Sequence, residues 1–371
     1  MQEFFIVPKI CILNECKEFI ENFQINQDDL IITTEFLYKN YFEHFSLNAK
    51  IVFQDHYGLG EPTDQMIESI YQDIKDFRYK RVIAVGGGSV IDISKIFVLK
   101  NIIPLGDLFE KKFPIIKEKE LIIVPTTCGT GSEVTNISIV NLLSKGTKMG
   151  LAVPELFAEN AVLISELVEK LPTYVFATSS IDALVHAVES ALSPKATVYS
   201  EMFSYRAIQE ILTSYQKIKT EGLENKGKYI KNILIASNMA GIAFGNAGCA
   251  AVHAMSYPLG GKYHIAHGES NYALFLGVLK YYYKKQPEGK ISKLNHFIAD
   301  ILNCTKEKVY DKLEELLDFL LKRKTLSEYG VNEKEIEEFT DLVMTKQQRL
   351  MANNYIPLDR NDVYEIYKSL L

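Results

Sequence analysis

The segment Arg81–Asp92, R-V-I-A-V-G-G-G-S-V-I-D, joins a β-branched apolar run to a glycine triplet and to the start of a helical pattern. A short continuous apolar run of this kind is typical of a strand that is buried on both faces of a parallel sheet. Gly86, Gly87 and Gly88 leave the backbone accessible at the start of the following helix, where N–H groups can bind a phosphate. The segment therefore predicts either a phosphate-binding turn or a plain tight turn in an α/β domain, although it matches neither G-x-G-x-x-G nor a Walker sequence.

The same alternation continues on both sides of this segment. Short apolar runs predict further strands at Asp29–Thr34, Lys50–Gln54 and Leu121–Val124. Apolar residues at helical spacing predict helices at Asp64–Phe77 and Val90–Lys100. Strands that alternate with helices indicate βαβ units, and hence a doubly wound parallel sheet.

A second polar loop, P-T-T-C-G-T-G-S-E-V-T from Pro125 to Thr135, follows the strand Leu121–Val124. Ligands bind beyond the carboxyl ends of the strands in open α/β sheets. We therefore expect this loop and the glycine turn to lie at one edge of the sheet and to bind a ligand together. The structural alternative is a connecting loop capped by Ser132. Cys128 lacks an identifiable paired base, so a nucleophilic role for it is the weaker interpretation.

Strand signals fade after about residue 171, and helical periodicity replaces them. The length suggests two domains, and we expect an α/β domain over residues 1–170 and a helical domain over residues 171–371, with a ligand-binding cleft between them. The predicted helices are Phe176–Leu192, Ser200–Ser214, Lys231–Phe244, Ala247–Tyr257, Tyr272–Tyr283, Lys306–Leu321, Glu333–Val343 and Asp362–Leu371.

Two segments of the helical half carry side chains suited to a transition metal. Asp182 and His186 are four residues apart in a helical run, so they share one helix face about 5–6 Å apart. The segment V-H-A-M-S-Y-P-L-G-G-K-Y-H-I-A-H-G adds His253, His264 and His267. One carboxylate with two or three imidazoles suits Zn²⁺ or Fe²⁺, whereas a surface pair or a capped turn is the structural alternative.

Composition excludes several classes of function. The formal net charge is −6 and the pI is about 5.8, so neither nucleic acid nor an anionic membrane surface is favoured as a partner. Five cysteines without C-x-x-C spacing are typical of unpaired thiols in a reducing compartment. The N-terminal sequence is unlike a signal peptide, and no apolar run approaches the length of a membrane span. We expect a cytoplasmic protein that acts on small molecules.

Four motifs, in this order, resemble those of the iron-containing (group III) alcohol dehydrogenases. They are G-G-G-S-x-x-D from Gly86, P-T-T-x-G-T-G-S-E-V-T from Pro125, D-A-L-x-H-A-x-E from Asp182 and H-A-x-x-x-P-L-G…H-G from His253. The resemblance covers nearly the whole chain. It implies an α/β Rossmann-like N-terminal domain and an all-α C-terminal domain, an architecture shared with dehydroquinate synthases. It also implies a homodimer.

Carried over to this sequence, the resemblance implies a site for a divalent metal, Fe²⁺ or Zn²⁺, and a site for NAD. The implied metal ligands, which would also be catalytic, are Asp182, His186, His253 and His267. The residues implied to contact the cofactor are Gly86, Gly87, Gly88, Ser89, Asp92, Thr126, Thr127, Thr130 and Lys148. Glu35 follows the second strand, where many relatives carry an aspartate, and its charge would repel a 2′-phosphate and favour NAD over NADP.

Two departures from the family pattern concern the substrate side. Tyr257 stands where most relatives have a second histidine beside the substrate, and a tyrosine with an ordinary pKa is not a base near pH 7. Ala266 replaces the usual proline before the last ligand. Lys262 and His264, with Tyr257 as a hydroxyl donor, are the candidates to hold a substrate carboxylate, and Arg349 is the alternative.

Within the family, Y-G-L-G-E-P-T-D-Q-M from Tyr57 and Q-Q-R-L-M-A-N-N-Y from Gln347 are most similar to members that interconvert 4-hydroxybutyrate and succinate semialdehyde with NAD(H). That resemblance implies a metal that activates the alcohol oxygen while hydride passes to the nicotinamide. A butanol, 1,3-propanediol or lactaldehyde type of dehydrogenase is the alternative within the family. A dehydroquinate synthase-like lyase or a non-catalytic nucleotide-binding protein are the alternatives outside it.

Overall fold

The computed structural model describes residues 3–371 as two compact units. The α/β unit comprises Ile6–Thr127 and Ser132–Lys170. The helical unit comprises Leu171–Leu371 together with Cys128–Gly131 and residues 3–5. Part of the polar loop after Pro125 thus belongs to the helical unit, which brings its glycines against helices distant in sequence.

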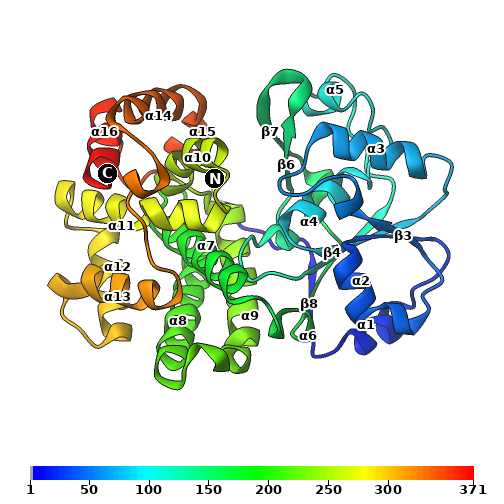
Figure 1. Ribbon diagram of the computed structural model, residues 1–371, viewed down its shortest axis with the longest axis horizontal. Helices are drawn as coiled ribbons and strands as arrows, with labels where there is room; N and C mark the ends of the chain where they lie inside the picture. The colour runs from blue at the N-terminus through cyan, green and yellow to red at the C-terminus, as the bar shows by residue number, and fades with distance from the viewer. Residues whose placement is uncertain (1–2) are drawn as a thin grey trace. The chain divides into compact units, whose positions relative to one another are not determined.

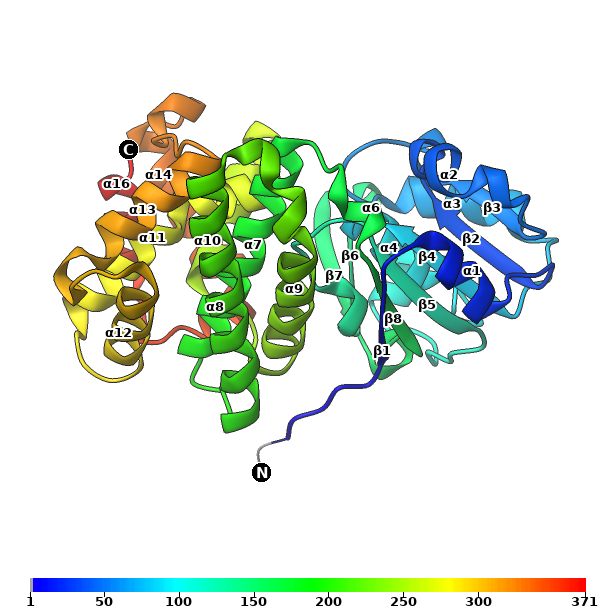
Figure 2. The ribbon, with the colours of Figure 1, turned by 90° about the horizontal axis from the view of Figure 1, so that it is seen from below.

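A six-stranded parallel sheet forms the centre of the α/β unit, in the order β1-β8-β5-β4-β2-β3 (Figure 2). The four strands predicted from apolar runs are confirmed, with ends shifted by one residue. β1 and β8, which pair with each other (Figure 2), were not predicted. β1 is an edge strand whose residues are exposed or half-buried. The strands are β1 (Lys9–Leu13), β2 (Asp29–Thr33), β3 (Lys50–Phe53), β4 (Arg81–Gly86), β5 (Glu120–Pro125) and β8 (Asn160–Ile164).

Alternate residues of the central strands enter two separate apolar clusters, one on each face of the sheet. Ile32, Ala84 and Ile123 belong to the first cluster, which includes residues of α3 and α4. Ile31 and Ile83 belong to the second, which includes residues of α1. Burial on both faces explains why these strands are continuously apolar. The helices of this unit are α1 (Cys16–Phe23), α2 (Glu35–Tyr41), α3 (Asp64–Ile74), α4 (Gly88–Ile96), α5 (Leu105–Phe109) and α6 (Glu166–Glu169).

An antiparallel hairpin that no pattern predicted follows the second polar loop. It consists of β6 (Ile137–Leu142) and β7 (Thr147–Ala152), which pair outside the main sheet. Alternating burial along β6 gives the hairpin one face against the core of the α/β unit. The backbone N–H of Ile139 on β6 bonds the carboxylate of Asp92 on α4 at 3.0 Å, so the hairpin is tied to the helix that follows the glycine turn.

The helical unit is organised around α7, which is buried along most of its length and packs against α8, α9 and α11 (Figure 1). No single helix within residues 3–371 is long and apolar enough to cross a bilayer. α9 and α10 have sufficient length and hydrophobicity only when they are taken together, and the chain bends by 107° between them. The helices are α7 (Thr173–Leu192), α8 (Val198–Glu221), α9 (Gly227–Ala247), α10 (Ala251–Tyr263), α11 (His267–Lys285), α12 (Lys290–Leu302), α13 (Val309–Leu320), α14 (Glu333–Lys346), α15 (Gln348–Met351) and α16 (Arg360–Ser369).

Several details of the helical half differ from the prediction. α12 and α15 were not predicted, α8 is longer than expected, and α11 begins at His267 rather than at Tyr272. The helix expected at Ala247–Tyr257 instead begins at Ala251 and continues past Pro258 to Tyr263. Gly248 causes the later start, because its φ of +82° is a left-handed conformation that ends α9. A Cβ atom at this glycine would also lie 2.4 Å from Nδ2 of Asn353.

Candidate metal and substrate site

One aspartate and three histidines from three helices converge in the helical unit. Asp182 and His186 lie on α7, His253 on α10 and His267 at the first position of α11, and one side-chain donor atom from each lies within 4.8 Å of the others. The Nε2 atoms of His186 and His253 are 2.9 Å apart. Asp182 Oδ1 lies 3.7 Å from Nε2 of both His253 and His267. The first three side chains are buried, whereas that of His267 is 39% exposed, so the cluster is accessible on the His267 side.

Glycines at the helix crossings allow this convergence. A Cβ atom on Gly268 would lie 1.9 Å from the carbonyl oxygen of Thr178, so the start of α11 lies directly against α7. Gly129 and Gly131 are held equally close to α7 and α9, since their Cβ atoms would lie 2.5 Å from Ser179 O and 2.4 Å from Gly241 Cα. The small residues in these motifs are therefore required by close backbone approach around the cluster.

The outer nitrogen of two imidazoles is held by an oxygen acceptor. His186 Nδ1 lies 3.2 Å from the carbonyl oxygen of Gly129, and His253 Nδ1 lies 2.6 Å from a carboxylate oxygen of Glu189. A carbonyl or carboxylate oxygen can only accept, so in neutral rings both Nδ1 atoms carry the proton and both Nε2 atoms carry a lone pair. Two lone pairs facing each other at 2.9 Å in a buried site repel unless a positive species lies between them. The donor set therefore fits a divalent cation.

Glu189 also holds the beginning of α10. Its carboxylate, on the same helix as Asp182, accepts from the backbone N–H groups of Ala250 at 3.0 Å and Val252 at 2.6 Å. The side chain is buried with both oxygens bonded, and a carboxylate at a helix N-terminus is favoured by the helix dipole. One residue thus orients His253 and anchors the helix that carries it. The sequence motif includes this glutamate, but sequence reasoning assigned it no role.

The two buried imidazoles have opposite pKa shifts. Burial, and then the neighbouring His253, lowers the pKa of His186 well below its ordinary value. Burial also lowers the pKa of His253, but the charge and hydrogen bond of Glu189 outweigh it and the net shift is upward. The His186 ring is accordingly neutral at physiological pH, with the lone pair of Nε2 available to a cation.

Asn271 is a member of the cluster that sequence reasoning missed. Its Nδ2 lies 2.7 Å from Asp182 Oδ1 and 3.2 Å from Nε2 of both His253 and His267. The side chain is fully buried, and its Oδ1 has no hydrogen-bond partner among residues 3–371. The spacing of four residues between His267 and Asn271 could have been the signal, because such residues share a helix face, but the helix predicted here began only at Tyr272 whereas α11 begins at His267.

A neighbouring group of Glu189, Cys249 and His253 also has donor atoms within 4.8 Å of one another. Burial, Glu189 and Asp182 raise the pKa of the Cys249 thiol well above its ordinary value. The thiol is therefore protonated and a poor ligand, and both Glu189 oxygens are already bonded. This group supports the cluster rather than forming a second one.

The glycine turn and the second polar loop follow adjacent strands, as expected. Gly86 at the end of β4 pairs with Pro125 at the end of β5, so Gly87 and Thr126 begin the two loops at one edge of the sheet. Gly88 starts α4, with Ser89 in its first turn. That these residues, with Thr127 and Thr130, contact a cofactor stays a prediction.

The charged residues predicted at the cofactor make contacts within the α/β unit. Asp92 accepts from Ser132 Oγ at 2.9 Å, in addition to its bond from β6. Lys148 on β7 pairs with Glu61 at 2.6 Å. Glu35 begins α2 directly after β2 and pairs with Lys39 at 2.7 Å, and this hydrogen bond is the largest cause of its lowered pKa. Their roles toward a nucleotide remain predictions.

The three substrate candidates lie in or just after α10. Tyr257 is half-buried one turn after His253, with its ring centroid 6.0 Å from that of His267. Lys262 is paired with Glu335 at 2.6 Å, and its side chain is 45% exposed. His264 is the exposed residue that ends α10, in a left-handed conformation with φ +53°. Of the three, Tyr257 lies nearest the ligand cluster by these contacts.

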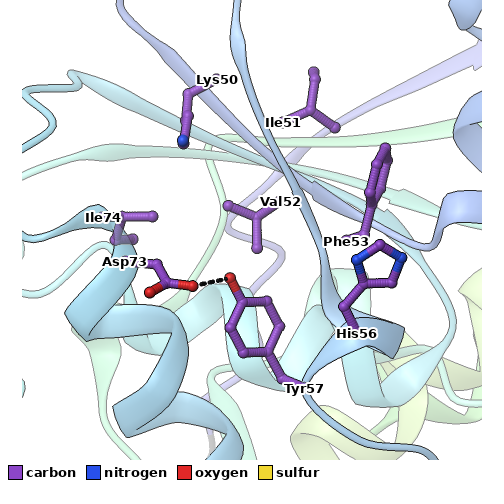
Figure 3. Close-up of a pocket in the computed structure, with 8 residues that line it drawn as sticks. All are labelled: Lys50, Ile51, Val52, Phe53, His56, Tyr57, Asp73 and Ile74. Atoms are coloured by element: carbon purple, nitrogen blue, oxygen red, sulfur yellow. Dashed lines mark hydrogen bonds between the residues drawn. The ribbon is translucent and has the colours of Figure 1, made fainter.

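The α/β unit also contains a surface pocket of about 330 Å³ between β3 and α3 (Figure 3). Lys50, Val52 and Phe53 line one side, and Asp73 on α3 bonds the hydroxyl of Tyr57 at 2.6 Å across it. The residues predicted from the sequence are not among those that line it, so it gives no support to the candidate site.

Comparison with known proteins places the chain in a family. The family description "Iron-containing alcohol dehydrogenase" matches residues 9–165, and "Fe-containing alcohol dehydrogenase family, C-terminal" matches residues 176–371. The chain is 51% identical to the 4-hydroxybutyrate dehydrogenase of Clostridium kluyveri over 98% of each protein. It is 33% identical to long-chain-alcohol dehydrogenase 1 of Geobacillus thermodenitrificans over 83% of this chain and 79% of that protein.

Solved structures show the same fold. Sulfoacetaldehyde reductase from Bifidobacterium kashiwanohense in complex with NAD⁺ has a TM-score of 0.84 at 20% identity, covering 100% of this chain and 98% of that one. A 1,3-propanediol oxidoreductase has a TM-score of 0.84 at 20% identity over 100% of each chain. Both sequence domains, the near full-length relative and the shared fold agree, and the chain belongs to the iron-containing alcohol dehydrogenase family.

Proposed function

We propose that this protein is a metal-dependent oxidoreductase that interconverts 4-hydroxybutyrate and succinate semialdehyde with NAD(H). The observation that carries the proposal is the 51% identity, over 98% of both chains, to the Clostridium kluyveri enzyme of that name. The convergence of Asp182 with three imidazoles supports the metal requirement.

Asp182, His186, His253 and His267 would hold the cation. When bound, a divalent cation supplies a Lewis acid that lowers the pKa of an alcohol or polarises a carbonyl. The protein's own contribution is orientation, because the Gly129 carbonyl and the Glu189 carboxylate fix the rings of His186 and His253. The exposed side of His267 gives the substrate oxygen a way in.

The glycine turn after β4 and the loop after β5 would bind the NAD diphosphate. Backbone N–H groups at the start of α4 suit an anionic group. Glu35 follows β2, the strand next to β4 in the sheet, and would accept from the ribose hydroxyls of NAD. NAD supplies or accepts the hydride. A fold relative, the sulfoacetaldehyde reductase, was solved in complex with NAD⁺.

Tyr257 would act as a hydrogen-bond donor to the reacting oxygen. It lies one helical turn after His253 and beside the ring of His267. A tyrosine with an ordinary pKa is not a base near pH 7, so we assign Tyr257 the orientation of the substrate and assign the proton transfer to another route.

We further propose a cytoplasmic homodimer that binds neither nucleic acid nor membrane. Family resemblance supports the dimer. The net charge of −6 disfavours binding to polyanions such as nucleic acid. The five free cysteines are typical of a protein in a reducing compartment. Light scattering of the purified protein tests the oligomeric state.

The decisive experiment is NADH oxidation by the purified protein, with succinate semialdehyde compared with butyraldehyde and with Fe²⁺ or Zn²⁺ added back after chelation. We expect kcat/KM for succinate semialdehyde to exceed that for butyraldehyde, with activity lost on chelation and restored by metal. Equal kcat/KM values for the two aldehydes would contradict the substrate assignment. Full activity in the chelated protein would contradict the metal requirement.

A further inference from the structure

A lysine is fully buried in the α/β unit, next to the polar loop that follows β5. Lys95 lies on α4, about two turns after the glycine turn at which this helix begins, and its side chain is 0% exposed. An ammonium group is costly to bury unless its N–H groups find acceptors and a counter-charge lies close by. The partners of Lys95 therefore indicate the reason for its burial.

Three acceptors surround the Nζ atom of Lys95, and all belong to the end of the polar loop or to the strand that follows it. Nζ lies 2.8 Å from Ser132 Oγ, 3.2 Å from Thr135 Oγ1 and 2.6 Å from the carbonyl oxygen of Ile137, the first residue of β6. Asp92, one turn earlier on α4, has a carboxylate oxygen 4.0 Å from Nζ and provides the counter-charge. The side chain of Lys95 thus fastens the end of the loop to α4.

The hydroxyl protons of this network are used in other hydrogen bonds. Ser132 Oγ donates to the carboxylate of Asp92 at 2.9 Å, and Thr135 Oγ1 donates to the carbonyl oxygen of Ser132 at 3.3 Å. Both hydroxyls therefore accept from Lys95, as the carbonyl oxygen of Ile137 does. Three acceptors require three N–H donors, which only the charged form of a lysine side chain has. The geometry therefore fits an ammonium group at this position.

The network involves both segments that would bind the NAD diphosphate. The glycine turn leads into α4, and the polar loop begins beside it, since a Cβ atom on Gly87 would lie 3.4 Å from Cγ2 of Thr127. The other end of the loop, residues 132–135, returns to α4 and is bonded there by Lys95 and Asp92. Both ends of the loop are therefore held at α4 or at the turn that precedes it.

We propose that Lys95 is a positioning residue for the cofactor: its ammonium group holds the end of the polar loop on α4, so that the loop and the glycine turn keep the arrangement that binds the NAD diphosphate. The inference rests on the proposed function. Because Lys95 is fully buried, it acts through the loop and not by contact with NAD. Asp92 acts in the same indirect way, since its two carboxylate oxygens accept from Ser132 Oγ and from the N–H of Ile139.

The test compares the Kd for NADH, measured by fluorescence, in the metal-loaded wild type and in three variants. We expect Lys95→Met to raise this Kd about 10-fold, because the loop loses its hydrogen bonds from a charged donor. Lys100→Met, at an exposed position shortly after α4, should leave the Kd unchanged. Ile96→Val removes one carbon from the buried face of the same helix, so it should lower the unfolding temperature but keep the Kd within about 2-fold of the wild type.

A second variant tests the same contact without removing the lysine. Thr135→Val deletes one of the three acceptors, and we expect it to raise the Kd for NADH about 3-fold. In the Lys95→Met background the same change should add nothing further, because the donor to Thr135 is already gone. Additive effects of the two changes would show that they act independently, which would overturn the inference.

The pH dependence of NADH binding separates positioning from general stabilisation. Burial lowers the pKa of Lys95 to about 8, and the carboxylates of Asp92 on α4 and Glu133 in the polar loop act in the opposite direction. Above this pH the neutral amine has two N–H groups for three acceptors. The wild-type Kd should therefore rise between pH 7 and pH 9 towards that of Lys95→Met, and a constant ratio of the two Kd values would contradict the inference.

The remaining outcomes also decide the matter. A folded Lys95→Met protein with a Kd within about 2-fold of the wild type would overturn the inference. An equal rise in Ile96→Val would do the same, because it would assign the effect to general loss of stability. A wild type that binds no NADH contradicts the proposed function itself, whereas a wild type that binds NADH no more tightly than Lys95→Met contradicts this inference alone.

Discussion

Replacing Glu189 with glutamine should weaken metal binding without removing any metal ligand. The carboxylate accepts three hydrogen bonds, from His253 Nδ1 at 2.6 Å and from the N–H groups of Ala250 at 3.0 Å and Val252 at 2.6 Å. A glutamine of the same size keeps one acceptor oxygen and turns an NH₂ group toward a donor. Either the ring of His253 or the start of α10 then loses its partner.

The expected magnitude follows from the contact that is lost. A hydrogen bond to a charged group contributes about 1.5–3 kcal/mol, and loss of the outer partner of a metal-bound histidine weakens metal affinity by about 10- to 100-fold. That range corresponds to about 1.4–2.8 kcal/mol. We expect the Kd for Zn²⁺ of Glu189→Gln to rise by this factor.

The assay is competition between the protein and a chromophoric chelator for Zn²⁺, with no substrate present, so it measures binding rather than turnover. Glu68→Gln, at an exposed position of α3, is the matched control and should leave the Kd unchanged. Thermal unfolding of the metal-free proteins shows whether the variant is folded. A folded Glu189→Gln protein with a Kd within about 2-fold of the wild type would refute the reasoning.

Three further predictions address other contacts. His267→Ala should abolish turnover but leave NADH binding, measured by fluorescence, within about 2-fold; an active variant would remove His267 from the ligand set. Asn271→Leu should raise the Kd for Zn²⁺ about 10-fold, because Asp182 Oδ1 loses its 2.7 Å partner; an unchanged Kd contradicts this role. Lys95 is fully buried, and burial lowers its pKa to about 8. The ordinary pKa of a lysine is 10.5. Between pH 8 and that pH, Lys95 has lost its proton in the folded protein but keeps it in the unfolded chain. The free energy of unfolding of the wild type, relative to that of Lys95→Met, should therefore rise by about 1.4 kcal/mol per pH unit in this range. Denaturant unfolding at pH 7.5, 9 and 10 measures this difference, and a flat difference would contradict it.

The sequence alone determined the class of the fold. Continuous β-branched runs predicted β2, β3, β4 and β5, because strands buried on both faces of a parallel sheet are apolar throughout. Helical periodicity predicted most of the helical unit. β1 and the β6–β7 hairpin escaped because an edge strand and a hairpin outside the sheet bury fewer side chains, which leaves a weaker pattern. The predicted start of α10 was wrong because α9 ends at Gly248, whose backbone is left-handed. Nothing in the surrounding run of small residues distinguishes this glycine.

For the site, the sequence determined only what is local. Asp182 and His186 share a face of α7 because helix geometry places residues four apart side by side. Which other side chains meet them was decided by helix packing: Gly268 lets α11 lie against α7, so that His267 and Asn271 lie beside Asp182. Periodicity within one segment cannot specify how two helices cross, because that depends on the shape and size of residues on both. The family motifs named the four ligands, and only the tertiary structure showed that Glu189 and Asn271 contact them.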